Sequence, residues 1–177
     1  MTVNRIPSST DFLGQTTFQF SIVKLPYTSF FVQSTLLPAI SLPSASYPNP
    51  NVNIPLPGDH IAFDPFSVTF KVDENMKNYI ELFYWLSGLG FPETTEQYRD
   101  ISKKQKGYGI FSDAELIILD GKHLPNVKVT FIDAFPTSLS EITMEYTDDD
   151  IEYRTCTATF EYQTFQIESL RTSNTLT

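Results

Sequence analysis

Few side chains in this sequence have the types and spacing that chemistry requires. His60 and His123 are the two histidines, and neither has a cysteine, histidine or carboxylate at metal-ligand spacing. The acidic run Asp148 to Asp150 offers oxygens to calcium, but it lacks the glycine and the distal glutamate of an EF-hand loop. A solvated hairpin turn explains this run better. The sequence therefore predicts no metal site and no cofactor.

Motifs for nucleophilic catalysis and for phosphate binding are missing as well. There is no Gly-x-Ser-x-Gly elbow, no phosphate-binding loop and no dinucleotide fingerprint. Cys156 is the single cysteine, and it falls on the apolar side of a strand pattern, where a buried thiol is the ordinary interpretation. Strands can bring distant carboxylates together for acid and base chemistry, but nothing singles out such a pair. We therefore expect a protein that is not an enzyme.

Length and composition favour one globular domain with a β-rich core. The chain has 177 residues, of which 41% are hydrophobic and 14% aromatic, enough to bury a core. We divide it into an N-terminal arm (1–15), a body (16–170) and a C-terminal tail (171–177). The net charge of -9 argues against a surface that binds the phosphate groups of nucleic acid tightly. No apolar run approaches the about 18 residues of a membrane span, so we expect no membrane partner.

Alternating apolar and polar residues predict several half-buried strands. The clearest are Phe66 to Val72 and the stretch around Thr155 to Gln163, in which every second residue is apolar. Further strands are expected at 16–25, 30–36, 114–119, 127–132 and 141–146. The acidic turn "TDDD" is expected to join the last of these to one long final strand.

The residues from Asp73 to Gly90 change to helical spacing. Asp73 or Asn75 is placed to cap the start of this helix, and Gly88 to end it. Its aromatic face, which includes Trp85, is expected to cover one open side of a sheet. Strands, one helix and further strands together predict a mainly β (α+β) fold, an antiparallel β-sandwich or open barrel flanked by one α-helix.

A long proline-rich stretch separates the second and third predicted strands. Leu36 to Asp59 holds half of the chain's 12 prolines, so central strand pairing is blocked there and edge strands are the most that it can form. Its apolar residues either fold back on the body or dock on another molecule, and the sequence leaves both open. The polar segment 91–109, with "KKQK" at its centre, reads as a solvated loop or as an interface with an acidic neighbour.

Three stretches of this sequence resemble the tail tube proteins of contractile-tailed, T4-like bacteriophages. They are "LLPAISLP" (36–43), "PLPGDHIAFDPFSVTFKVDENMKNYIELFYWLSGLG" (55–90) and "NVKVTFIDAFPTSLSEI…DIEYRTCTATFEYQTFQI" (126–167). The resemblance implies that six copies close into a ring whose inner sheets join as one barrel. Rings then stack into the inner tail tube through which phage DNA is ejected.

The resemblance also implies roles for particular residues. The loop that would contact the adjacent ring or subunit contains Tyr47, Asn49, Asn51, Val52, Ile54, Leu56 and Asp59. For the lumen, the first candidates are the polar faces of two strands, with Ser67, Thr69, Lys71, Thr155, Thr157, Thr159 and Glu161. A bore lined with carboxylates would repel the phosphate backbone and let DNA pass without specific binding.

Further partners and alternatives follow from the same resemblance. The chain would be assembled in the host cytoplasm into the virion tail, beside sheath and baseplate or neck proteins. A terminator, or a tube initiator near the baseplate, would use the same fold but form one ring. From another class, a ligand-binding β-sandwich would use Tyr27, Phe30, Phe31 and Tyr47 as a surface platform. A hydrolase with two carboxylates has no support in the sequence.

Overall fold

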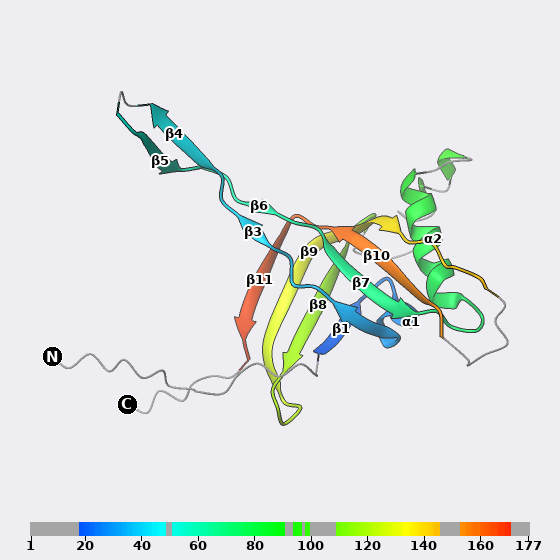
Figure 1. The fold of residues 1–177 in the computed structure, drawn as a ribbon. Coiled ribbons are helices and arrows are strands. Elements are labelled where there is room, and N and C mark those ends of the chain that lie inside the picture. The colour runs from blue at the N-terminus through cyan, green and yellow to red at the C-terminus, as the bar shows by residue number, and fades with distance from the viewer. Residues whose placement is uncertain are drawn as a thin grey trace.

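The computed structural model describes residues 18–48, 51–90, 94–96, 98–99, 109–145 and 153–170. Strands precede and follow the main helix, as the sequence predicts (Figure 1). The elements are β1 (Phe18–Ile22), α1 (Pro26–Phe30), β2 (Val32–Thr35), β3 (Ile40–Ser41), β4 (Ser44–Pro48), β5 (Asn53–Pro57), β6 (Ala62–Phe63), β7 (Phe66–Lys71), α2 (Lys77–Gly90), β8 (Ser112–Leu119), β9 (Pro125–Leu139), β10 (Thr155–Glu161) and β11 (Thr164–Ser169).

One antiparallel sheet forms the body and bends around the core. Its strand order is β1-β8-β9-β10-β7-β2, and β11 also pairs with β9. The 15-residue strand β9 belongs to two layers: residues 127–134 pair with β8 and β11, and residues 135–139 pair with β10. Asp133 has a φ of 55° beside a register shift, which marks a bulge that bends the strand. The result is an open antiparallel sandwich rather than a closed barrel, as Figure 1 shows.

Aromatic side chains from both layers fill the core. The ring of Phe66 stacks on Phe131 and Phe160, with centroids 4.3 Å and 5.1 Å away. Burying each such ring contributes about 1.5–3 kcal/mol. Trp85 of α2 is buried against Phe160 and donates its indole N–H to the Ile110 carbonyl at 3.0 Å. The prediction that the helix covers the sheet is confirmed for Trp85, but the predicted aromatic face is wrong in part. Phe83 and Tyr84 are 50% and 67% exposed, and the buried residues of α2 are Asn78, Leu82, Trp85 and Gly88.

The structure corrects the predicted helix boundaries and adds a second helix. Helix α2 begins at Lys77 rather than after Asp73 or Asn75, and it ends at Gly90 rather than Gly88. The side chain of Asn78 ties the first turn of α2 to the end of β7, because its amide donates to the Lys71 carbonyl at 2.6 Å. The short helix α1 was not predicted. Its five residues are too few for periodicity to reveal, and the Thr28 hydroxyl ties it to α2 through the Asn78 carbonyl at 3.1 Å.

The predicted hairpin of the closing third is also wrong in part. Residues 141–145 form no strand, and β9 extends to Leu139 to supply the partner of β10 instead. The expected single final strand divides at Tyr162 into β10 and β11, which pair with different halves of β9. Because β9 is bent, one straight strand cannot follow it across both layers. The "TDDD" run at 147–150 lies outside the described residues, so its turn stays a prediction.

No helix within the described ranges combines the length and the apolar character needed to cross a membrane.

Candidate assembly surfaces

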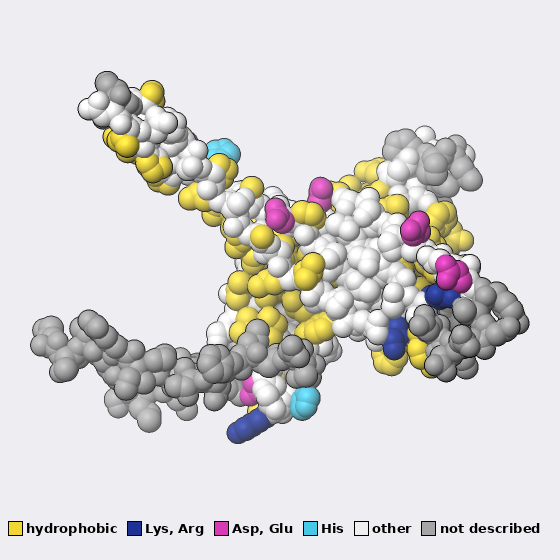
Figure 2. All heavy atoms as spheres, viewed as in Figure 1, with side chains coloured by type: hydrophobic (Ala, Val, Ile, Leu, Met, Phe, Trp, Pro, Cys, Tyr) yellow, Lys and Arg dark blue, Asp and Glu magenta, His cyan; other side chains and the backbone are white. Residues whose placement is uncertain are grey.

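A proline-rich arm projects from the body as a two-stranded ribbon. Strand β3 pairs with β6 near the root, and β4 pairs with β5 further out. The arm stands away from both layers (Figure 1), and apolar side chains run along its length (Figure 2). All residues of β4 and β5 are exposed, so this ribbon does not fold back on the body. Of the two alternatives that the sequence leaves open, only docking on another molecule would cover it.

The hairpin at the end of the arm has one apolar face. Tyr47 lies opposite Ile54 and Ala45 opposite Leu56, and paired residues share a face of the ribbon. Tyr47 is 62% exposed and Leu56 47%, a large apolar area for a protein surface. The predicted contact residues Tyr47, Ile54 and Leu56 thus lie together on one face. Asn51 and Val52 lie at the hairpin turn, and Asp59 lies just after β5, next to Gly58. Asn49 lies outside the described residues, and the contact role of the set stays a prediction.

An aromatic cluster anchors the root of the arm on the body. The ring of Phe63 contacts Phe165 and Tyr162, with centroids 5.6 Å and 6.1 Å apart. Tyr162 donates its hydroxyl to the Asp64 carbonyl at 2.9 Å. Burial, and then the negative charge of Asp64, raise the pKa of the Tyr162 hydroxyl, which keeps this donor protonated. The arm therefore leaves the body at the junction of β10 and β11.

Threonine and serine hydroxyls cover the outer face of β7 and β10. Alternate residues of both strands are buried, so the predicted division into an apolar and a polar face is confirmed. The pairing places Thr69 opposite Thr157, and their hydroxyls share a hydrogen bond of 2.9 Å. The other predicted lumen residues join this row: Ser67 lies opposite Thr159, Lys71 opposite Thr155, and Glu161 beyond them.

This hydroxyl face carries little charge. Among its seven predicted lumen residues, Lys71 is the one cation and Glu161 the one anion. Neighbouring strands extend the hydroxyls, since Thr35 donates to the Ser67 carbonyl and Thr137 to the Thr159 carbonyl, both at 3.2 Å. The row of carboxylates expected for a DNA passage is therefore not found on this face. Such a surface avoids phosphate binding by offering few cations rather than by repulsion.

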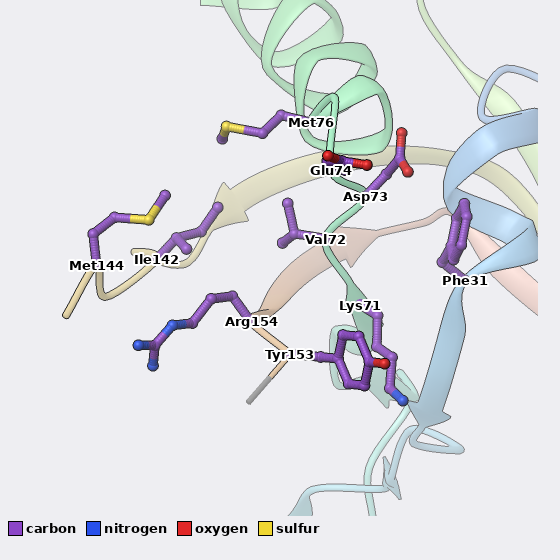
Figure 3. Close-up of a pocket in the computed structure, with 10 residues that line it drawn as sticks. All are labelled: Phe31, Lys71, Val72, Asp73, Glu74, Met76, Ile142, Met144, Tyr153 and Arg154. Atoms are coloured by element: carbon purple, nitrogen blue, oxygen red, sulfur yellow. The ribbon is translucent and has the colours of Figure 1, made fainter. Parts of the chain in front are cut away.

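A pocket of about 730 Å³ lies at the end of the hydroxyl face, beside the start of α2 (Figure 3). Lys71 sits 4.9 Å from the Tyr153 ring, and Arg154 donates to the Glu145 carbonyl at 3.1 Å, so both cations have partners. No histidine, cysteine, serine or threonine is among the described residues that line it. The lining residues are Phe31, Lys71, Val72, Asp73, Glu74, Met76, Ile142, Met144, Tyr153 and Arg154.

The remaining predicted sites do not assemble in the structure. Tyr27, Phe30 and Phe31 lie in or beside α1, while Tyr47 lies on the arm, so the four aromatics form no single ligand platform. In the described part of the chain, no three His, Cys, Asp or Glu side chains are placed to hold a metal ion. Cys156 is buried, and the interpretation of its thiol as a core group is confirmed.

Comparison with known proteins identifies the family. Residues 3–168 match the family model described as phage tail tube protein. The chain belongs to the phage tail tube protein family. The resemblance found in the sequence is thereby confirmed, and the protein is a tail component and part of the virion.

Individual relatives of this tail tube family member are terminators. The chain is 28% identical over 163 residues to the tail tube terminator protein of Enterobacteria phage T4, covering 83% of this chain and 85% of that protein. Its fold is similar to the tube-terminating cap of the anti-feeding prophage, with a TM-score of 0.56 at 16% identity over 96% and 99% of the two chains. The sheath/tube terminator of the PVC extracellular contractile injection system gives 0.55 at 14% identity over 90% and 99%. The chain is thus a tube-like protein of contractile tail systems.

Proposed function

We propose that this protein is the tube terminator of a contractile phage tail, and that it forms one closed ring at the end of the tail tube. The observation that carries the proposal is the 28% identity to the T4 tail tube terminator across most of both chains. The likeness to two terminator folds supports the same choice. A stacking ring of the tube itself is the second candidate, favoured by the family description and by a TM-score of 0.52 to the PVC sheath-tube complex.

Ring closure follows from edges that a single copy leaves open. The layer made of the end of β9, β10, β7 and β2 has β2 as one edge and β9 as the other. Unpaired strand edges attract other strands, and cyclic symmetry removes them by pairing each copy with the next. Six copies, the number that the resemblance implies, would join these layers into one barrel around a bore.

The two candidate surfaces take complementary parts in this ring. The hydroxyl face of β7 and β10 would line the bore, and its single cation, Lys71, would leave little to hold passing DNA. The arm would dock its apolar face on the adjacent copy, which removes its exposed side chains from water. Sheath proteins and neck or baseplate proteins would contact the outside of the assembled ring.

Electron microscopy of the purified protein at high concentration tests the proposal. Single closed rings are expected for a terminator, and long tubes would instead identify a main tube protein. In a phage that lacks this gene, loss of a terminator should leave tubes of irregular length, whereas loss of the main tube protein should leave no tube. A protein that stays monomeric at every concentration and complements neither defect would contradict both candidates.

A further inference from the structure

The hydrogen-bond pattern of the arm differs between its two edges. The Gly58 N–H donates to the Pro43 carbonyl at 2.7 Å, which makes this pair a hydrogen-bonded pair of the ribbon. Hydrogen-bonded and non-hydrogen-bonded pairs alternate along an antiparallel ladder. Tyr47 and Ile54, four residues along each strand from that pair, therefore bond to each other. Ala45 and Leu56 bond in the same way. The alternate pairs point their backbone groups outward, and these are Ser44 with Pro57, Ser46 with Pro55, and Pro48 with Asn53.

One edge of the arm is consequently closed to strand addition and the other is open. On β5, Pro55 and Pro57 occupy outward positions and have no N–H to donate. On β4, Ser44 and Ser46 present both N–H and C=O groups at the corresponding positions. Pro48 is the one proline at an outward position of β4, and it lies at the end of the strand next to the turn. The two prolines on β5 protect that edge and leave Ser44 and Ser46 of β4 as the place where another strand can pair.

The body has a matching open edge at β11. The Leu170 N–H donates to the Asn126 carbonyl at 2.9 Å, so the alternation directs Gln166 and Glu168 toward β9. Phe165 and Ile167 then point their backbone groups away from β9. No other strand of the described ranges pairs with this edge, and β11 contains no proline.

The other edge of the same layer is already covered. Strand β1 lies beside α1, and the Ile22 N–H donates to the Ser29 hydroxyl at 3.0 Å rather than remaining available to a partner strand. In the second layer, β2 is four residues long and has a register shift after Val32. The six-residue β11 is therefore the longer and more regular edge for an added strand.

We propose that β4 of one copy adds as a strand to the free edge of β11 in a neighbouring copy. The proposal rests on the ring of identical copies described above and names the surface that receives the arm. The occupant is a second copy because the arm of the same copy projects away from the layers (Figure 1). The apolar face of the hairpin fits this place, since Ile167 lies on the core side of β11 opposite buried Val129 and is still 59% exposed. The addition is parallel, because only then do the outward backbone groups of Ser44 and Ser46 bond to those of Phe165 and Ile167 while Tyr47 shares the face of Ile167. Tyr47 and its neighbours would continue the apolar side of the layer over Ile167.

A pair of proline substitutions tests strand addition directly. Ser46→Pro removes an outward N–H from the open edge without touching the hydrogen bonds inside the hairpin, because the backbone groups of Ser46 point away from β5. Asn53→Pro makes the same change on the protected edge. We expect Ser46→Pro to weaken assembly about tenfold in sedimentation and Asn53→Pro to leave it nearly unchanged. Equal effects of the two substitutions would overturn the proposal.

Cysteine cross-linking locates the partner strand. Ala45→Cys and Ile167→Cys are made in separately tagged copies, mixed and oxidised, because Ala45 shares the apolar face of the hairpin that is proposed to lie over Ile167. Asn53→Cys replaces Ala45→Cys as the control. Disulfide-linked dimers that carry both tags are expected for the first mixture and not for the second. If wild-type rings form while the first mixture gives no such dimer, the strand pairing is wrong and the terminator ring stands. If the dimer forms in a protein that makes no ring, the pairing stands and the proposed function fails.

Discussion

Gly58 donates its backbone N–H to the carbonyl oxygen of Pro43 at 2.7 Å, and the two backbones lie so close that a Cβ at position 58 would overlap that oxygen. This contact joins the root of the arm to its outer hairpin. Since Pro43 contributes backbone rather than a flexible side chain, the chain has to move to admit any other residue.

We therefore expect Gly58→Ala to disrupt assembly while the body stays folded. The arm buries no residue in the core, so the free energy of unfolding should fall by at most about 1 kcal/mol. The melting temperature should then fall by at most a few degrees. Gly121→Ala is the matched control, because an added Cβ there meets nothing within 4 Å. Sedimentation and thermal unfolding of both variants check the prediction. A Gly58→Ala protein that assembles like the wild type would show that assembly does not depend on the close contact between Gly58 and Pro43.

The double substitution Ile54→Ser and Leu56→Ser should abolish assembly without destabilising the isolated copy. Both side chains are more than 40% exposed, so the folded monomer loses little burial. An apolar interface loses about 0.8 kcal/mol per buried CH₂ that is removed. Asn53→Ser, on the opposite face of the same strand, is the control and should assemble normally. Urea unfolding and electron microscopy separate the two effects, and a large loss of stability in the double variant would contradict the prediction.

Phe66→Ala should destabilise the protein by about 3–5 kcal/mol. The ring is fully buried between Phe131 and Phe160, and a cavity remains when it is removed. Phe30→Ala provides the contrast, because Phe30 is 82% exposed and its loss should cost at most about 0.5 kcal/mol. Chemical denaturation of the two variants measures the difference, which should exceed the experimental error severalfold.

Glu81 makes stability depend on pH. Burial raises the pKa of its carboxyl above the ordinary value of 4.5, although hydrogen bonds from the Thr28 and Tyr27 backbone lower it in part. One carboxylate oxygen is buried without a hydrogen-bond partner in the described structure. Because the folded-state pKa is raised, ionisation opposes folding, and stability falls as pH rises from the unfolded pKa through the folded one.

Glu81→Gln should remove this pH dependence. The stability of the wild type relative to the variant is expected to be highest at acid pH and to decrease as the pH rises past the ordinary value of 4.5. Urea unfolding of both proteins from acid to neutral pH measures the difference. A difference that rises with pH would mean that the hydrogen bonds to the carboxylate outweigh its burial.

Thr157→Cys should report whether the hydroxyl face lines the bore. In the unassembled protein a bulky maleimide should label the introduced thiol, and ring closure should slow the labelling at least about tenfold by restricting access to the bore. Lys122→Cys, in the exposed turn between β8 and β9, should label at a similar rate in both states. The native Cys156 should not react with the maleimide, because burial raises the pKa of its thiol and shields the thiol from the reagent. Equal labelling rates of the Thr157→Cys variant before and after assembly would place this face outside the bore.

Local alternation in the sequence was enough to define both faces of β7 and β10. Side chains of a strand point to opposite sides at each step, so the division between buried Phe66, Val68 and Phe70 and their polar neighbours needs no knowledge of the partner strands. The same reasoning found α2, whose helical spacing continues over 14 residues. The order of these elements, with their prolines and glycines, carried the resemblance to the tail tube family, and the match of residues 3–168 to the family model confirmed it.

Long-range geometry decided the rest. Whether the proline-rich stretch folds back or projects depends on whether the body has an apolar surface to receive it, which no local pattern records. The division of the last strand at Tyr162 and the length of β9 follow from a bulge that bends the sheet, and the sequence shows no sign of it. Net charge is a sum without positions, so the sequence alone could not say which face carries the carboxylates. The sequence therefore determined which residues share a face, because that periodicity is local, while the tertiary structure decided which faces and edges remain uncovered, because coverage depends on distant segments.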